Sequence, residues 1–163
     1  YIAQTDNCFI QQVNLNLNKN DANYITTIAG QNGYCSSASA DGQGLSARFS
    51  YIKNVALNAN HSHLYVADNN KLRIFNLNTH IVSTISSTQL ETFKSLVINP
   101  NNQLYAGNNS VKKISYFFDT YLADTVITPS MLSNEEVIDM ALSDDGQYLY
   151  ILDSYSIHKI VLP

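Results

Sequence analysis

Charged residues are scarce in this sequence: Asp, Glu, Lys and Arg make up 13% of the 163 residues, against about 25% in typical soluble domains. The 9 Lys and Arg are outnumbered by 13 Asp and Glu, so the net charge is −4 and the positive surface that binds nucleic acid is missing. No stretch is rich in Ala, Glu and Lys, and 20 Asn residues fill the place of charged ones. Because Asn is a poor helix former, this composition disfavours a protein of long helices.

Long apolar runs are missing too. The sequence contains no run of about 18 apolar residues, so no segment is predicted to enter a membrane. No signal peptide is visible, and a mature or excerpted chain would have lost one. Hydrophobic residues nevertheless make up 45%, and a chain of this length buries about 70% of its unfolded surface. One domain with a proper core is therefore expected.

A short apolar-aromatic motif recurs along the chain. It occupies residues 64–68, 104–107 and 149–153, and a fourth copy opens the chain at 1–4. Its tyrosines, Tyr1, Tyr65, Tyr105 and Tyr150, are 64, 40 and 45 residues apart. Two of these spacings match the roughly 40–50 residues of a four-stranded propeller blade. The larger spacing requires an insertion, which residues 30–53 supply.

Alternation with period 2 divides each repeat into short strands. The first repeat has a stub followed by strands at 8–17 and 23–29; the alternation is strictest over 13–18, where Asn follows every apolar residue. The remaining strands are predicted at 54–59, 63–68, 71–77, 80–86, 94–99, 103–107, 110–116, 121–128, 137–143, 147–152 and 156–161. Tight-turn residues at 99–102 and 144–146 separate first from second strands.

These patterns predict an all-β fold, a β-propeller of four-stranded antiparallel blades with about three and a half blades present. A β-sandwich is the alternative for regularly spaced strands, but the self-similarity favours the propeller. Three and a half blades cannot close a ring, and an open edge leaves backbone donors unpaired, so we expect a larger propeller or one completed by a partner. The predicted units are a partial blade at 1–29, a Gly/Ser-rich inter-blade loop at 30–53, blades at 54–87 and 94–129, and a partial blade at 137–163.

Residues 24–75 carry an ordered set of short motifs. Thr26-Thr27-Ile28-Ala29-Gly30 is followed by Asp41-Gly42, then by Ala47-Arg48-Phe49, and then by the repeat motif that ends at Asp68. In order and spacing this resembles the NHL-repeat propellers over about one and a half repeats, although Ile52 and Asn54 replace the Pro and Gly common before the innermost strand.

The NHL resemblance implies a binding scaffold in which the first strand of each blade lines a central channel. It also implies a structural signature of Asp41, Gly42, Arg48, Phe49 and Asp68, with Arg48 bracing the loop. It implies no reaction, because one fold hosts unrelated functions.

The two cysteines, Cys8 and Cys35, are predicted to form a disulfide. On the blade pattern Cys8 starts a third strand and Cys35 follows the antiparallel fourth, so the two lie close together; two free thiols in a reducing compartment are the alternative. Glycosylation motifs begin at Asn60 and Asn108, both in predicted hairpin turns. Together with the scarcity of lysine, these features favour an extracellular or cell-surface protein.

No catalytic or metal site is identified, and no cofactor is predicted. His61 and His63 point the same way on a strand and could share a metal ion, but they lack a third ligand and are interpreted as structural. Asp68 and Asp153 occupy equivalent positions after second strands; they could bind calcium but are expected to hydrogen-bond the following turn. Ser and His residues occur without any pattern that assembles a catalytic triad.

We therefore expect a non-enzymatic, secreted or surface-exposed glycoprotein propeller that acts as a protein-interaction and assembly scaffold. Its partner would be another protein, or further copies or segments that complete the propeller, including a homo-oligomer or filament. Two alternatives stay open: an intracellular NHL-type scaffold, and a propeller enzyme of the lyase or lactonase type with a metal in the central channel. The inner strands offer such a metal only Asn54, Asn58, Asn99 and Asp139.

Overall fold

The structure is a computed structural model that describes residues 1–31, 33, 35, 38–86, 92–117, 120–132 and 135–162. Its strands form four antiparallel sheets that follow one another along the chain, and its described helices are three short 3-10 turns, η1 (Thr5–Asn7), η2 (Gly44–Ser46) and η3 (Pro129–Leu132). The predicted all-β class is confirmed. No helix in the described ranges is long and apolar enough to span a membrane.

Each sheet is a blade or part of one. Blade 1 has the order β1 (Ile2–Gln4), β2 (Phe9–Val13) and β3 (Ile25–Gly30), and blade 2 consists of β5 (Ile52–Leu57), β6 (His63–Asp68), β7 (Lys71–Asn76) and β8 (Ile81–Ile85). Blade 3 consists of β9 (Ser95–Ile98), β10 (Leu104–Gly107), β11 (Val111–Phe117) and β12 (Thr120–Ile127), and blade 4 of β13 (Asp139–Leu142), β14 (Tyr148–Leu152) and β15 (Ile157–Val161).

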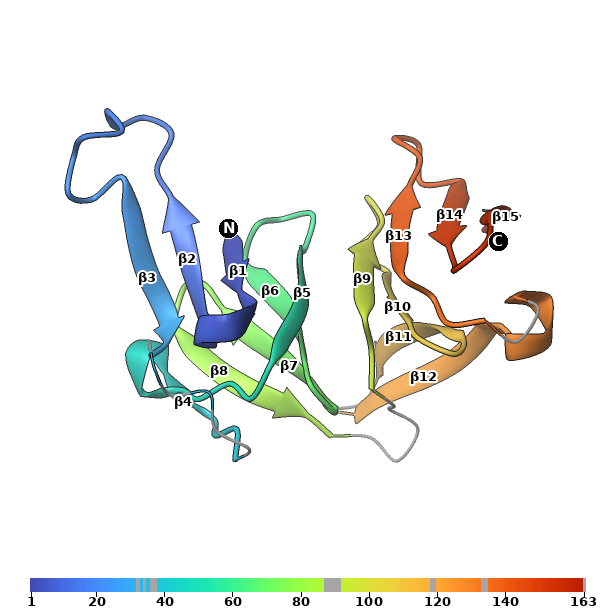
Figure 1. Ribbon diagram of the computed structural model, residues 1–163, viewed down its shortest axis with the longest axis horizontal. Helices are drawn as coiled ribbons and strands as arrows, with labels where there is room; N and C mark the ends of the chain where they lie inside the picture. The colour runs from blue at the N-terminus through green and yellow to red at the C-terminus, as the bar shows by residue number, and fades with distance from the viewer. Residues whose placement is uncertain are drawn as a thin grey trace.

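The blades stand side by side in chain order around an open arc (Figure 1). The innermost strands β5, β9 and β13 are neighbours in pairs, and β1 lies against β5. Consecutive antiparallel meanders arranged around a common axis are the architecture of a β-propeller. The protein is therefore a β-propeller portion with two complete and two partial blades, as the repeats predict.

Three hydrophobic cores lie between successive blades, and the repeated motif explains them. Along β6, Leu64 and Val66 belong to the core shared with blade 1, whereas Ala67 belongs to the core shared with blade 3. The same alternation puts Leu104 toward blade 2 and Tyr105 toward blade 4. Each strand thus contributes to two cores, at roughly 1.5–3 kcal/mol for each fully buried large side chain.

One predicted strand segment is wrong. The strict alternation over 13–18 predicts a strand, but β2 ends at Val13 and the chain turns. The Asn14 Oδ1 accepts the N–H of Asn16 at 3.1 Å, the Asn14 carbonyl accepts the N–H of Leu17 at 3.1 Å, and Leu15 is 82% exposed. Asn side chains bind nearby backbone and compete with strand pairing, so alternation alone does not make a strand here.

The segment from 30 to 53, predicted as an inter-blade loop, contains regular structure. The short strand β4 (Gly42–Gln43) pairs antiparallel with β8 and gives the second blade a fifth strand. Ala40 and Arg48 form a further bridge across this segment. The Gly42 backbone lies so close to the returning chain that an added Cβ would sit 3.2 Å from the Ala47 nitrogen, which explains the glycine at this position.

Candidate functional site

A buried arginine organises the junction of blades 1 and 2. Arg73 on β7 is fully buried, and its Nη1 donates to Asp68 Oδ2 at 2.9 Å while its Nη2 donates to Asp41 Oδ1 at 2.8 Å. The same guanidinium donates to the carbonyls of Ala40 at 2.9 Å and Arg48 at 3.2 Å. We call this set the Arg73 network. It fastens the segment 40–49 to the face of blade 2.

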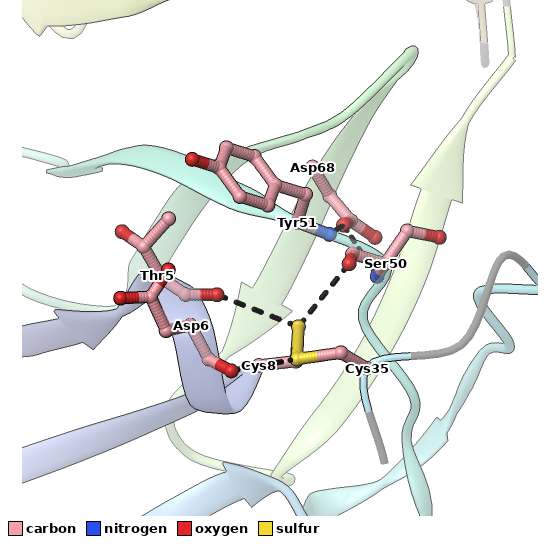
Figure 2. The surroundings of a disulfide bond; sticks show 7 residues. All are labelled: Thr5, Asp6, Cys8, Cys35, Ser50, Tyr51 and Asp68. Atoms are coloured by element: carbon pink, nitrogen blue, oxygen red, sulfur yellow. Dashed lines mark hydrogen bonds between the residues drawn. A yellow bond between two sulfur atoms is a disulfide. The ribbon is translucent and has the colours of Figure 1, made fainter. Parts of the chain in front are cut away.

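Asp68 is the fully buried anionic member of the Arg73 network. Its Oδ1 accepts the backbone N–H of Ser50 at 2.7 Å and of Tyr51 at 2.9 Å (Figure 2). Charged groups are stable in a protein interior when paired and hydrogen-bonded, and Asp68 meets both conditions. Contrary to expectation, this carboxylate binds the chain that enters β5 rather than the turn that follows β6, so its role is structural.

Asp41 holds the outer side of the network. Its Oδ2 accepts the N–H of Thr84 at 3.0 Å, and its Oδ1 accepts the Thr84 hydroxyl at 2.8 Å. Partial burial raises the pKa of Asp41, but the Thr84 hydrogen bonds and the charge of Arg73 outweigh it, so the pKa lies below its ordinary value. The Phe49 ring lies 5.4 Å from the Arg73 guanidinium carbon, within the range of a cation–π contact.

The predicted signature residues therefore lie close together, but Arg73, the residue that joins them, was not identified from the sequence. Asp41, Phe49 and Asp68 all contact Arg73, which the sequence presents only as a cation on a predicted third strand. Arg48 contributes its carbonyl to Arg73, and its own Nη1 donates to the carbonyls of Leu45 and Ala47 at 2.8 Å each. Arg48 thus braces the loop as the family resemblance implies.

The predicted pairing of Cys8 with Cys35 is confirmed: the two form a disulfide with Cα atoms 5.2 Å apart. Figure 2 shows the bond beside the chain that leads into β5. The Cys8 Sγ lies 3.2 Å from the carbonyl oxygen of Ser50. Since a disulfide sulfur has no proton to donate, this is a close sulfur–oxygen contact. Ser50 therefore touches both the disulfide and, through its N–H, Asp68.

A second polar cluster closes the turn between β14 and β15. The Asp153 Oδ1 accepts the N–H of Tyr155 at 2.9 Å and of Ser156 at 2.7 Å, so Asp153 binds the following turn as expected. The His158 Nε2 lies 2.6 Å from Asp153 Oδ2 and 3.0 Å from the Ser156 hydroxyl. A catalytic triad uses opposite ring nitrogens for the acid and the nucleophile. Here both oxygens meet one nitrogen, so this Asp-His-Ser group is not arranged as a triad.

Replacing Asp153 by Asn is expected to make stability less dependent on acid pH. The hydrogen bond with His158, followed by those from Tyr155 and Ser156, holds the pKa of Asp153 far below its ordinary value of 3.8. A depressed carboxyl pKa stabilises the folded state above the ordinary value, and that stabilisation is lost as the pH falls below it. The melting temperature of the wild type, followed from about pH 6 to about pH 2, should therefore fall more steeply than that of Asp153→Asn.

The exposed Asp144 provides the matched control, because it lies in the connection between β13 and β14. Asp144→Asn therefore removes a carboxylate from the same blade without touching the turn between β14 and β15. This variant should keep the acid slope of the wild type. Equal slopes for the wild type and Asp153→Asn would refute the prediction.

The two histidines of the possible metal pair lie at and just before the start of β6. His61 lies in the turn before β6, and the His63 Nδ1 is 2.7 Å from the Ser62 hydroxyl. Within the described ranges, no three His, Cys, Asp or Glu residues lie close enough together to hold a metal ion.

Of the two predicted glycosylation sites, Asn60 is exposed, and its Oδ1 accepts the Ser62 hydroxyl at 2.7 Å. Asn108 is half-buried and its Oδ1 is shielded from solvent, so Asn60 is the more accessible glycan acceptor.

Comparison with known proteins supports the fold. No protein-family model matches the sequence, and no curated protein matches it either. Among solved structures, a gluconolactonase from Xanthomonas campestris matches with a TM-score of 0.58 at 14% identity, over 72% of this chain and 39% of the enzyme. The extracellular domain of BT4673 from B. thetaiotaomicron matches with a TM-score of 0.59 at 15% identity, over 83% of this chain and 17% of that one.

A third similar structure is the dihydro-heme d1 dehydrogenase NirN, with a TM-score of 0.55 at 13% identity, over 71% of this chain and 27% of the enzyme. This chain therefore spans well under half the length of the structures it resembles. The neighbours include enzymes and an extracellular domain, so at these identities they establish the propeller fold and no particular activity.

Proposed function

We propose that this chain is part of a non-enzymatic, extracellular glycoprotein propeller of the NHL type that acts as a scaffold for protein interaction. The observation that carries the proposal is the outward face of blade 4, the side turned away from blade 3. Ile157 and Val161 of β15 are each 72% exposed there, and Leu152 of β14 is 40% exposed. Lys159 lies between Ile157 and Val161 on the same face, with its ammonium 3.8 Å from the centre of the Tyr148 ring. Monomeric proteins rarely leave exposed aliphatic residues gathered on one sheet face uncovered.

The other blades indicate what covers such a face. Tyr105, Val111 and Ile127 on the outward side of blade 3 are each at most 1% exposed, because Leu149 and Ile151 of blade 4 pack against them. The interfaces between blades 1 and 2 and between blades 2 and 3 repeat this arrangement. The partner expected on blade 4 is therefore a β-sheet that presents aliphatic residues. Blades 2 to 4 present such residues on the side that faces the preceding blade.

Blade 1 offers a mixed surface, in which Ile2 and Ile25, 37% and 44% exposed, flank polar side chains. On its outward side the Gln4 amide donates to the Gln11 side chain at 3.2 Å, and Thr27 is exposed on the same face. A head-to-tail contact between two copies would set the Gln4 and Gln11 side chains of this mixed face against aliphatic residues of blade 4 and bury amide groups without new partners, which is unfavourable. We therefore favour a further blade over a second copy as the occupant.

The extracellular assignment rests on the Cys8–Cys35 disulfide, which persists in oxidising compartments. The exposed glycan acceptor Asn60 is consistent with it. The motifs between 24 and 75 that resemble NHL propellers support the scaffold role, since that family consists mostly of binding proteins.

A photo-crosslinking amino acid at position 157 tests the proposal in protein made by its natural source. We expect crosslinks to a strand with alternating aliphatic residues, identified by mass spectrometry of the joined peptides. The substitution Val161→Lys should abolish them, because it adds a second ammonium beside Lys159 on this face, and burial of an unpaired charge is unfavourable. The same probe at position 27, beside Gln11 on the mixed face of blade 1, serves as the control. Crosslinks at 157 no more abundant than at 27, or joining 157 to blade 1 of another copy, would contradict the proposal.

A further inference from the structure

A hollow of about 250 Å³ opens between blades 2 and 3, away from both the Arg73 network and the outward face of blade 4. Tyrosines from three strands converge on it, one each from β6, β11 and β12. We call it the tyrosine hollow. Its lining consists of Tyr65, Tyr116 and Tyr121, of Leu104, Ile114 and the turn residues Asn102 and Gln103, and of Lys113 and Ser115 on β11.

The tyrosine hollow is a departure from the repeat. In blade 2, Phe75 of β7 pairs with Val82 of β8, and at the matching register of blade 3 Ile114 pairs with the smaller Ala123. Two residues further along, blade 2 has Leu77, which packs against the core. Blade 3 has Tyr116 at the corresponding place.

Tyr116 remains 59% exposed instead of closing the interface. The hollow opens beside Ile114 and Tyr116 and is bordered by phenol rings.

The rings form a preorganised surface. Tyr116 and Tyr121 lie side by side with centroids 4.8 Å apart and planes inclined at 44°. The face of an aromatic ring carries negative charge density and attracts electropositive C–H groups. Burial, reinforced by the neighbouring phenols of Tyr65 and Tyr116, raises the pKa of Tyr121 to about 12. Its hydroxyl therefore stays protonated at physiological pH and can both donate and accept a hydrogen bond.

The charged residue of the lining, Lys113, directs its side chain away from the hollow. Lys113 alternates with Ile114 along β11 and pairs with Tyr105 and Asp124, so its side chain lies on the opposite face of the sheet. The Asn102 Oδ1 is occupied by the N–H of Ala59 at 2.8 Å, and no described residue accepts a hydrogen bond from its Nδ2. The hollow thus offers aromatic faces, phenol hydroxyls and the amides of Asn102 and Gln103. A ligand that suits it is neutral, with an apolar C–H face and hydroxyls at its rim.

We propose that the tyrosine hollow binds one neutral pyranose unit of a glycan, stacked on Tyr121 and Tyr116 and hydrogen-bonded to Tyr65 and Asn102. Small-molecule sites usually enclose roughly 300–1,000 Å³, so a hollow of about 250 Å³ takes a single sugar ring rather than an oligosaccharide. A nucleobase would also stack, but nucleic acid needs basic contacts to its phosphates, and the net charge of −4 opposes them.

Titration with methyl β-glucopyranoside, methyl β-galactopyranoside and N-acetylglucosamine tests the proposal. The chain has no Trp and 11 Tyr, so its intrinsic fluorescence reports on tyrosines directly, and saturation-transfer NMR shows which sugar protons touch the protein. We expect saturable, millimolar binding of at least one glycoside. Tyr121→Ala should weaken it by about tenfold, the upper range of one lost aromatic contact. Ala123→Val, which restores the blade 2 residue, should weaken it as well.

Tyr155→Ala is the matched control, because Tyr155 is 86% exposed on blade 4 and should leave affinity unchanged. If Tyr121→Ala fails to fold, as judged by circular dichroism, Tyr116→Ala replaces it at a position already largely exposed. The proposal is overturned if no glycoside binds saturably, or if the folded Tyr121, Tyr116 and Ala123 variants all bind as tightly as the wild type. Binding of uridine in place of the sugars would also overturn it.

Discussion

Arg73→Met is expected to lower the free energy of unfolding by about 3–5 kcal/mol, the usual cost of removing one partner of a buried ion pair. The substitution leaves the fully buried Asp68 carboxylate without its cation. It also removes the guanidinium hydrogen bonds to the carbonyls of Ala40 and Arg48, which then keep only the backbone hydrogen bonds that Ala40 and Arg48 exchange at 3.0 Å. Urea denaturation followed by circular dichroism measures the change.

Lys19→Met is the control for loss of a positive charge, since Lys19 is exposed in the β2–β3 connection. It should change stability by no more than about 0.5 kcal/mol. Asp68→Asn added to Arg73→Met should cost less than the sum of the two single changes, because the asparagine removes the stranded charge. An Arg73→Met variant within about 1 kcal/mol of the wild type would mean that the guanidinium does not carry the junction.

The importance of Arg73 could not be read from the sequence, and the reason is physical. On β7, Arg73 lies between the apolar residues Leu72 and Ile74. Side chains alternate between the two faces of a strand, and the sequence pattern does not show which face carries Arg73 or whether that face is buried. Only the return of segment 40–49 over blade 2 supplies Asp41 and the carbonyls that make burial of Arg73 favourable. The motifs around Asp41 and Asp68 placed both residues in one structural signature. That Arg73 binds both carboxylates follows only from the tertiary contact between segment 40–49 and blade 2.

Strand positions were predictable wherever apolar residues alternate and a neighbouring strand is available. The strand predicted at 63–68 coincides with β6, because both faces of Leu64–Ala67 contribute to cores. The strand predicted from the alternation over 13–18 was wrong, because the Asn14 side chain binds the backbone there and Leu15 is exposed to solvent. The tyrosine hollow was not foreseen either. It forms where tyrosines from β6, β11 and β12 meet between two blades, a meeting that only the tertiary structure reveals.

Cys8→Ala/Cys35→Ala is expected to lower the free energy of unfolding by about 3.5 kcal/mol, as loop closure predicts for a separation of this size. The disulfide joins residues 27 positions apart and links the start of β2 to the segment that follows β3. Without it the unfolded chain gains the freedom of that loop. Denaturation of the wild type with and without dithiothreitol should reproduce the loss seen in the double variant.

The disulfide and the Arg73 network should also be coupled. Ser50 contacts both: its carbonyl lies 3.2 Å from the Cys8 sulfur, and its N–H donates to Asp68 at 2.7 Å. Groups that share a partner show interaction energies of roughly 0.5–3 kcal/mol, whereas distant sites add independently. Combining Arg73→Met with the two alanine substitutions should therefore give a loss that differs from the sum. An additive loss would show that the two features stabilise blades 1 and 2 separately, despite meeting at one residue.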